Sequence, residues 1–280
     1  YSEDPYREFL PQTGQVCELI WPDNGTRIES GITQGTNVGT AFDPMLAKVI
    51  VHRDSREAAI AALIAALDQT AILGVTTNLG FVRNLADSFE FTDGEIHTSW
   101  LDTRPESVFT PPVCPEEVLA QAAKLLSSNR DKGLPTDGWR LAGPARPQRI
   151  RLHAEGEEAR WIDVPEAPHP GVFAHTDGVR VWLAHRGQNW LVSGSDGMRR
   201  DKHIVEGGPE VLAPMPGLML LVDVADGQAV EVGDRLGVME AMKMELSLTA
   251  PVAGRVSVRV TEGAQVSMGH LLFEIEVNDD

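Results

Sequence analysis

The C-terminal part of the chain contains the same strand-and-turn pattern twice. One copy begins with Ala-Pro-Met-Pro-Gly at 213–217 and the other with Ala-Pro-Val-Ala-Gly at 250–254, and alternating Val and Leu residues broken by Gly follow each. Such alternation is typical of short strands that bury one face, with turns at the glycines. Because one copy could not bury that face alone, the doubled unit predicts two similar sheets that close on one core.

The connection between the two copies contains Lys243, flanked by Met242 and Met244. We expect a lysine at a tight turn of such a sandwich to be exposed, fixed at its backbone and free at its tip. An ordinary surface lysine is the common alternative. Two methionines in positions that should also be exposed favour a recognition site, because methionine is adaptable and common on recognition surfaces. We therefore expect the pair to be read by an enzyme that modifies Lys243.

The string Ala241 to Met244 resembles the Ala-Met-Lys-Met motif of the biotin carboxyl carrier domains of biotin-dependent carboxylases. The resemblance implies a flattened all-β sandwich of the biotinyl/lipoyl type over residues 207–280. It also implies that a biotin protein ligase attaches biotin covalently to Lys243, beside Met242 and Met244. A lipoyl-type acyl carrier, which has the same doubled sheet, is the alternative.

Residues 1–109 have the pattern of an α/β region. Residues 15–21 and 26–32 are expected to form a hairpin closed by an Asp-Asn-Gly turn, since Asn-Gly is a strong turn signal. A third strand is expected over 45–52. An apolar stripe predicts a helix from a cap at 54–55 to about residue 70, and a second helix is expected to begin near Asn78.

Several strings in this region resemble the C-terminal subdomain of biotin carboxylase. They are Arg-Ile-Glu-Ser-Gly at 27–31, Phe-Asp-Pro-Met-Leu-Ala-Lys at 42–48 and Gly-Val-Thr-Thr-Asn at 74–78, with Phe42 where a tyrosine is usual. The resemblance implies that Arg27 is a catalytic residue that stabilises the enolate form of biotin. A planar, permanently cationic guanidinium suits that role. Lys48 is expected in a structural ion pair, and Asp43 at a turn or cap.

Residues 110–206 are expected to form a helix over 116–128 and then an antiparallel β-barrel of short strands at 139–141, 149–153, 160–164, 171–175, 179–185 and 189–192. The region is similar in position to the connecting domain of propionyl-CoA and methylcrotonyl-CoA carboxylase α subunits, which contacts the carboxyltransferase β subunit. A simple spacer is the alternative. The tryptophans are expected in the core, although an exposed one would be a candidate contact for a partner.

The bulk properties exclude several classes of function. The chain has 280 residues and a formal net charge of −17, which disfavours nucleic acid and anionic membrane surfaces as partners. No apolar run is long enough to span a bilayer. Cys17 and Cys114 are far apart, and the eight histidines form no ligand pair, so a disulfide framework and a metal held by this chain are not expected. Because the sequence starts at Tyr1 without an initiating methionine, we expect it to be the C-terminal part of a longer protein.

The resemblances together imply a multidomain, ATP-dependent ligase: the biotin-carrying α subunit of an acyl-CoA carboxylase, with the methylcrotonyl-CoA type favoured. ATP and Mg²⁺ would be bound by residues outside this chain, and a hinge is expected at 200–208. Carboxylated biotin would deliver CO2 to an acyl-CoA on the carboxyltransferase β subunit of a hetero-oligomer, in a bacterial cytoplasm or a mitochondrial matrix. A carrier and assembly module without its own catalysis is the alternative.

Overall fold

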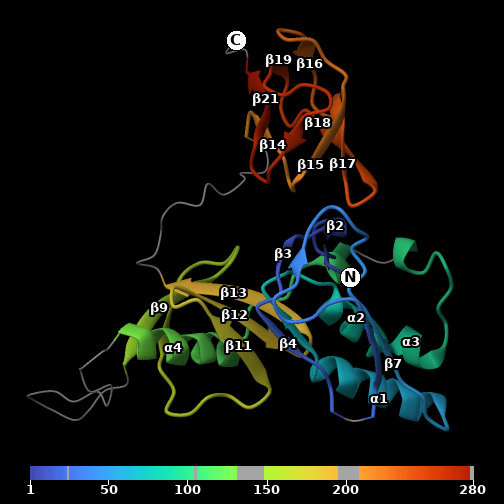
Figure 1. The fold of residues 1–280 in the computed structure, drawn as a ribbon, viewed down its shortest axis with the longest axis vertical. Coiled ribbons are helices and arrows are strands. Elements are labelled where there is room, and N and C mark those ends of the chain that lie inside the picture. The colour runs from blue at the N-terminus through green and yellow to red at the C-terminus, as the bar shows by residue number, and fades with distance from the viewer. Residues whose placement is uncertain (24, 104–105, 131–147, 195–207, 278–280) are drawn as a thin grey trace, which may run out of the picture. The chain divides into compact units, whose positions relative to one another are not determined.

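The computed structural model describes residues 1–23, 25–103, 106–130, 148–194 and 208–277 (Figure 1). These residues form two compact units. One holds most of residues 1–194, and the other holds residues 208–277 together with Pro11–Thr13 and Val38–Pro44. The three-domain division at 109/110 and 206/207 stays a prediction. The expected strand at 139–141 and most of the expected hinge at 200–208 lie outside the described residues.

The N-terminal region contains short two-stranded ladders. They pair β1 (Glu3–Asp4) with β2 (Leu10–Pro11), β3 (Gly14–Gln15) with β6 (Asn37–Val38), β4 (Glu18–Ile20) with β8 (Ala71–Leu73), and β5 (Arg27–Ser30) with β7 (Ala47–Ile50). The expected hairpin of residues 15–21 with 26–32 is therefore wrong. The reason is that β8 is fully buried, so β4 gains more by pairing with that distant apolar strand than a local turn can offer.

The two predicted helices of this region are present as α1 (Arg56–Asp68) and α2 (Leu79–Ala86). A short helix α3 (Phe89–Asp93) and 3-10 turns at Leu101–Thr103 and Glu106–Phe109, which the sequence did not predict, follow them. Ser55 caps α1, because its hydroxyl accepts a hydrogen bond from the backbone N–H of Ala58 at 3.2 Å. The predicted cap and the start of α2 after Asn78 are both confirmed.

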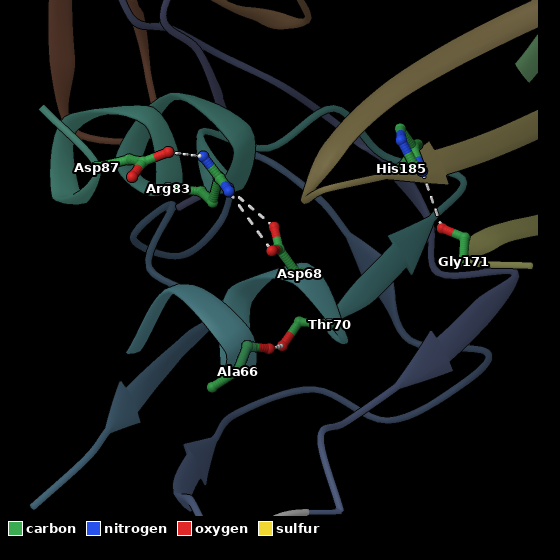
Figure 2. A network of polar contacts seen from close by, with 7 residues as sticks. All are labelled: Ala66, Asp68, Thr70, Arg83, Asp87, Gly171 and His185. Carbon is green, nitrogen blue, oxygen red and sulfur yellow. Dashed lines mark hydrogen bonds and ion pairs between the residues drawn. The ribbon is translucent and has the colours of Figure 1, made fainter. Parts of the chain in front are cut away.

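One arginine joins α1 to α2. Figure 2 shows Arg83 of α2 donating to the Asp68 carboxylate at 2.8 Å and to Asp87 at 2.6 Å. Thr70 closes the end of α1 by donating its hydroxyl to the carbonyl of Ala66 at 2.8 Å. Hydrogen bonding to Asp68 raises the pKa of Arg83, which keeps the bridge charged. The two helices are thus held by a charged contact as well as by apolar packing.

The middle region forms one antiparallel sheet of order β10-β9-β13-β12-β11. Its strands are β9 (Arg149–Ala154), β10 (Arg160–Asp163), β11 (Val172–Thr176), β12 (Arg180–His185) and β13 (Gln188–Gly194). Helix α4 (Glu116–Arg130) lies across one face (Figure 1) and buries Val118, Leu119 and Ala122 against it. Among the described residues β10 and β11 remain separate edges, so the sheet is open where we expected a closed barrel.

The other face of this sheet is divided. Near β11, Ala184 packs on the buried Ala71 and Leu73 of β8, and the Asn189 amide donates to the carbonyl of Ile72 at 2.8 Å. At the opposite edge, Trp161 of β10 is 59% exposed, so the expectation that it lies in the core is wrong. Residues alternate between faces along a strand, and Ile162 rather than Trp161 points to α4.

The C-terminal region is a sandwich of two four-stranded sheets, β14-β21-β19-β16 and β18-β17-β15-β20. Its strands are β14 (Glu210–Leu212), β15 (Gly217–Val222), β16 (Ala229–Val230), β17 (Arg235–Ala241), β18 (Met244–Thr249), β19 (Gly254–Val258), β20 (Gln265–Val266) and β21 (Leu271–Glu276). Met219, Met239, Leu272 and Phe273 of these strands are fully buried. The predicted doubled sandwich is confirmed, with one copy starting at Gly217 and the other at Gly254.

Along the described parts of the chain, no helix combines the length and the apolar character that a bilayer crossing requires.

Candidate functional site: a lysine at the tip of a hairpin

The hairpin between β17 and β18 turns in only two residues. Ala241 pairs with Met244, which leaves Met242 and Lys243 as the turn. Both have a left-handed backbone, with φ of 50° and 63°. Two consecutive left-handed residues define a type I′ turn, whose twist matches that of the flanking strands and which normally favours Asn and Gly. A lysine in this place tolerates strain that those residues would avoid, which is common at functional positions.

The side chains of the turn differ in their exposure. Lys243 is exposed, and among the described residues its ammonium has neither a hydrogen-bond nor an ion-pair partner. Met244 is 45% exposed, as expected, but Met242 is only 3% exposed, so the prediction of two exposed methionines is wrong. Met244 begins β18, whose first residues face solvent, whereas Met242 continues the buried end of β17. The tip of the hairpin therefore exposes Lys243 in the turn and Met244 at the start of β18.

Two carboxylates lie at the base of the hairpin. Glu240 and Glu245 are directly opposite each other in the register of β17 and β18. Like charges placed opposite each other on adjacent strands are destabilising. The exposed lysine is therefore presented on an acidic base, and a surface that approaches Lys243 meets both negative charges.

Gly217 allows the hairpin to pack closely on β15. A Cβ atom at this position would lie 2.6 Å from the Glu240 carbonyl oxygen and 3.3 Å from the Ala241 Cβ. Sequence reasoning did not identify Gly217 as a residue that supports the site. The signal was present, because Gly occupies the same point of both copies of the repeat, at 217 and 254.

Arg27 lies on the N-terminal ladder β5–β7. It is exposed and forms an ion pair with Glu29 on the same face of β5. Lys48 lies opposite Glu29 in the register, but in the described part of the chain it forms no ion pair, so the structural ion pair expected for Lys48 is absent. The guanidinium is thus a permanent positive charge on an open face, held by one carboxylate.

The two cysteines differ in environment. Cys114, beside α4, is buried, and burial with the nearby Glu157 raises the pKa of its thiol to about 12. Cys17 is only partly buried, and both thiols are free. A thiol held protonated at neutral pH is a poor nucleophile or metal ligand, which gives Cys114 a packing role. Within the described ranges no three His, Cys, Asp or Glu side chains gather as a metal site.

Comparison with known proteins assigns both ends of the chain. Residues 1–103 match the biotin carboxylase C-terminal domain, and residues 209–275 match the family model described as biotin-requiring enzyme. The first range contains Arg27 and the second contains Lys243. Neither match reaches the middle sheet.

Curated relatives match along nearly the whole chain. The biotin-dependent acyl-coenzyme A carboxylase alpha3 subunit of Mycobacterium leprae is 30% identical, over 98% of this chain and 42% of its own length. The mitochondrial methylcrotonoyl-CoA carboxylase subunit alpha of Rattus norvegicus is 28% identical, over 99% of this chain and 46% of its own length. The mitochondrial propionyl-CoA carboxylase alpha chain of Caenorhabditis elegans is 28% identical, over 89% of this chain and 43% of its own length. The chain spans less than half the length of these relatives.

A solved single-chain, multi-domain long-chain acyl-CoA carboxylase is 23% identical, covering 95% of this chain and 19% of its own with a TM-score of 0.34. The sequence matches agree with the order of elements found here, in which an α/β region precedes a doubled sandwich with a lysine hairpin. The chain contains a biotin carboxylase C-terminal domain and a biotin-requiring domain, and it is a homologue of the alpha subunits of biotin-dependent acyl-CoA carboxylases.

Proposed function

We propose that Lys243 is the attachment site of biotin and that the chain is the biotin-carrying part of an acyl-CoA carboxylase. The observation that carries the proposal is the exposed Lys243, without a partner among the described residues, at the tip of a two-residue turn inside the biotin-requiring domain. The two-residue turn fixes the lysine backbone, and the neighbouring Met242 is buried. A group bound to the ammonium nitrogen would project into solvent, where other sites can reach it.

Attached biotin would supply a ureido nitrogen that takes up and releases a carboxyl group. ATP and Mg²⁺ would be bound by parts of the parent enzyme outside this chain. Arg27 would place positive charge beside an anionic oxygen of the substrates, and Glu29 would orient its guanidinium. In the parent enzyme, Arg27→Met should lower the turnover of biotin carboxylation far more than it lowers stability.

Coexpression of this chain with an active biotin ligase tests the attachment. Intact mass should increase by one biotinyl group, streptavidin should capture the protein, and Lys243→Ala should abolish both. A lipoyl adduct of different mass would support the alternative of a lipoyl-type acyl carrier. An unmodified wild-type chain would overturn the proposal.

A second assay distinguishes the proposal from the alternative of a carrier and assembly module without its own catalysis. The purified chain is incubated with ATP, bicarbonate and free biotin, and carboxybiotin is measured. We expect no turnover from this chain alone and turnover from the parent enzyme. Turnover from the chain alone would refute the carrier-only alternative and contradict the view that the ATP site lies outside this chain.

Trp161 supports a partner contact on the middle sheet, for which we propose the carboxyltransferase β subunit. It is a large exposed aromatic side chain on the edge strand β10, and tryptophan is enriched among residues that dominate binding energy. Trp161→Ser should weaken capture of that subunit at least about tenfold. Val179→Ser is the matched control, since Val179 is exposed in the loop before β12. Equal effects of the two substitutions would refute the contact.

The acyl group is the finer part of the proposal. Relatives named for methylcrotonoyl-CoA and for propionyl-CoA match this chain at 25–28% identity, which leaves both substrates open, with the methylcrotonyl type as our first expectation. Turnover of the assembled complex on a panel of acyl-CoAs decides between them. The carboxylation would take place in a mitochondrial matrix or in a bacterial cytoplasm, according to the organism that makes the protein.

A further inference from the structure

Met268 is a strongly exposed apolar residue of the C-terminal sandwich, at 66%. It lies in the turn between β20 and β21, where the N–H of His270 donates to the Ser267 carbonyl at 3.0 Å and Gly269 has φ of 76°. The N–H of Gly269 also donates to the Ala213 carbonyl at 2.8 Å. The backbone therefore holds Met268 in a fixed place, and its exposure does not arise from a loose loop.

The strand register places this turn at the same end of the sandwich as Lys243. One row of paired residues, Glu245, Glu240, Leu218 and Gln265, crosses the four strands of the sheet that contains β17 and β20. Lys243 is three residues beyond Glu240, and Met268 is three residues beyond Gln265 in the same direction. Because β17 and β20 are two strand spacings apart, the two turns are separated by roughly 10 Å.

The internal repeat supplies a second turn of the same construction. In it the N–H of Asp234 donates to the Glu231 carbonyl at 3.1 Å and the N–H of Gly233 donates to the Ala250 carbonyl at 2.8 Å. Val232 occupies the position of Met268 and is equally exposed, at 68%. It precedes β17, however, and this strand of 7 residues places it about 20 Å from the hairpin. Only the copy with methionine lies beside the lysine.

We propose that Met268 and Met244 form one surface, here called the methionine rim, through which biotin protein ligase recognises the carrier domain. This inference deepens the proposed function and rests on it. The ligase acts before biotin is attached, so it must recognise the protein surface around Lys243. Enzyme sites that act after attachment can bind the biotin itself. Two exposed apolar side chains near Lys243, with Glu240 and Glu245 paired at the base of the same hairpin, fit a ligase surface that has an apolar pocket flanked by basic groups.

The test compares Met268→Ser with Val232→Ser in the full 280-residue chain, and Lys243→Ala gives the background. A purified biotin ligase is supplied with ATP and biotin, and the initial rate of biotin incorporation is measured over a range of carrier concentrations. We expect Met268→Ser to lower kcat/KM about tenfold, mainly through KM, which is the effect of removing one buried interface anchor. Val232→Ser should leave kcat/KM within about twofold of wild type. Circular dichroism melting should be the same for both variants.

Each other outcome overturns the inference. Equal rates for Met268→Ser and wild type would remove Met268 from the ligase contact, and equal losses in both serine variants would show a non-specific effect of surface apolar residues. Normal biotin incorporation with slower carboxyl transfer by the assembled enzyme would assign the methionine rim to a carboxylase site instead. A wild-type chain that takes up no biotin would contradict the proposed function itself, which is a different failure.

Discussion

The left-handed turn at Lys243 makes a quantitative prediction about stability. Lys243→Gly and Lys243→Ala both remove the exposed side chain, and neither variant can carry biotin, so they differ only in backbone preference. A residue with a Cβ pays roughly 1–2 kcal/mol to adopt the left-handed conformation, which the φ of 63° at this position demands. Glycine avoids that cost, but it lowers the free energy of unfolding by about 0.4–1 kcal/mol because it gives the unfolded chain more conformational entropy. The glycine variant should therefore be more stable by about 1 kcal/mol.

The chain offers an internal control for this measurement. All six tryptophans precede residue 195, so tryptophan fluorescence reports none of the C-terminal sandwich, whereas far-UV circular dichroism reports both units. On heating, the dichroism transition of the sandwich should occur roughly 4–8 °C higher in Lys243→Gly than in Lys243→Ala. The fluorescence transition should be the same in both. Equal dichroism transitions, or a more stable alanine variant, would refute the argument that this turn is strained.

Four further predictions concern packing, burial and charge. Gly237→Ala should destabilise the sandwich by about 1–3 kcal/mol in denaturant unfolding, because the new Cβ would lie 2.5 Å from a carbonyl oxygen; Gly31→Ala, with its nearest atom at 3.6 Å, should cost far less. A thiol reagent at pH 8 should label Cys17 and spare Cys114, whose pKa burial raises to about 12, and labelling of both thiols in the folded chain would contradict this. Because the Cys114 thiol ionises earlier when unfolded, its contribution to the free energy of unfolding should decrease as pH rises above about 9.0. Arg83→Met should lower the free energy of unfolding by about 1–3 kcal/mol, since it leaves a partly buried carboxylate without its partner, and an unchanged urea midpoint would rule this out.

Local signals in the sequence predicted the features that depend on local interactions. Ser55 before an apolar stripe predicted the start of α1, and the repeated glycines at 217 and 254 predicted the doubled sandwich. The motif around Lys243 predicted an exposed lysine on a hairpin, which the structure contains. These signals are reliable because a cap, a period or a turn is decided by residues that are neighbours in the chain.

Features that depend on distant contacts could not be predicted in the same way. The pairing of β4 with β8 joins residues about fifty positions apart, and the turn signal at Gly25 gave no warning of it. The alternation of buried and exposed residues along a strand ends at a turn. The sequence pattern therefore could not predict that Met242 is buried while Met244 is exposed. The open edge at Trp161 follows from which side of β10 the helix α4 covers, and that is set only when the helix and the sheet pack together.

The anchoring of Met242 has a consequence for how far Lys243 can reach. With its neighbour sealed in the interior and its backbone locked in a tight turn, the lysine contributes only rotation about its own side-chain bonds. Anything fixed to its nitrogen would sweep a small cap-shaped volume centred on one immobile point. Travel over larger distances would have to come from displacing the whole sandwich as a rigid body, so stiffening the turn further should leave the range of delivery unchanged.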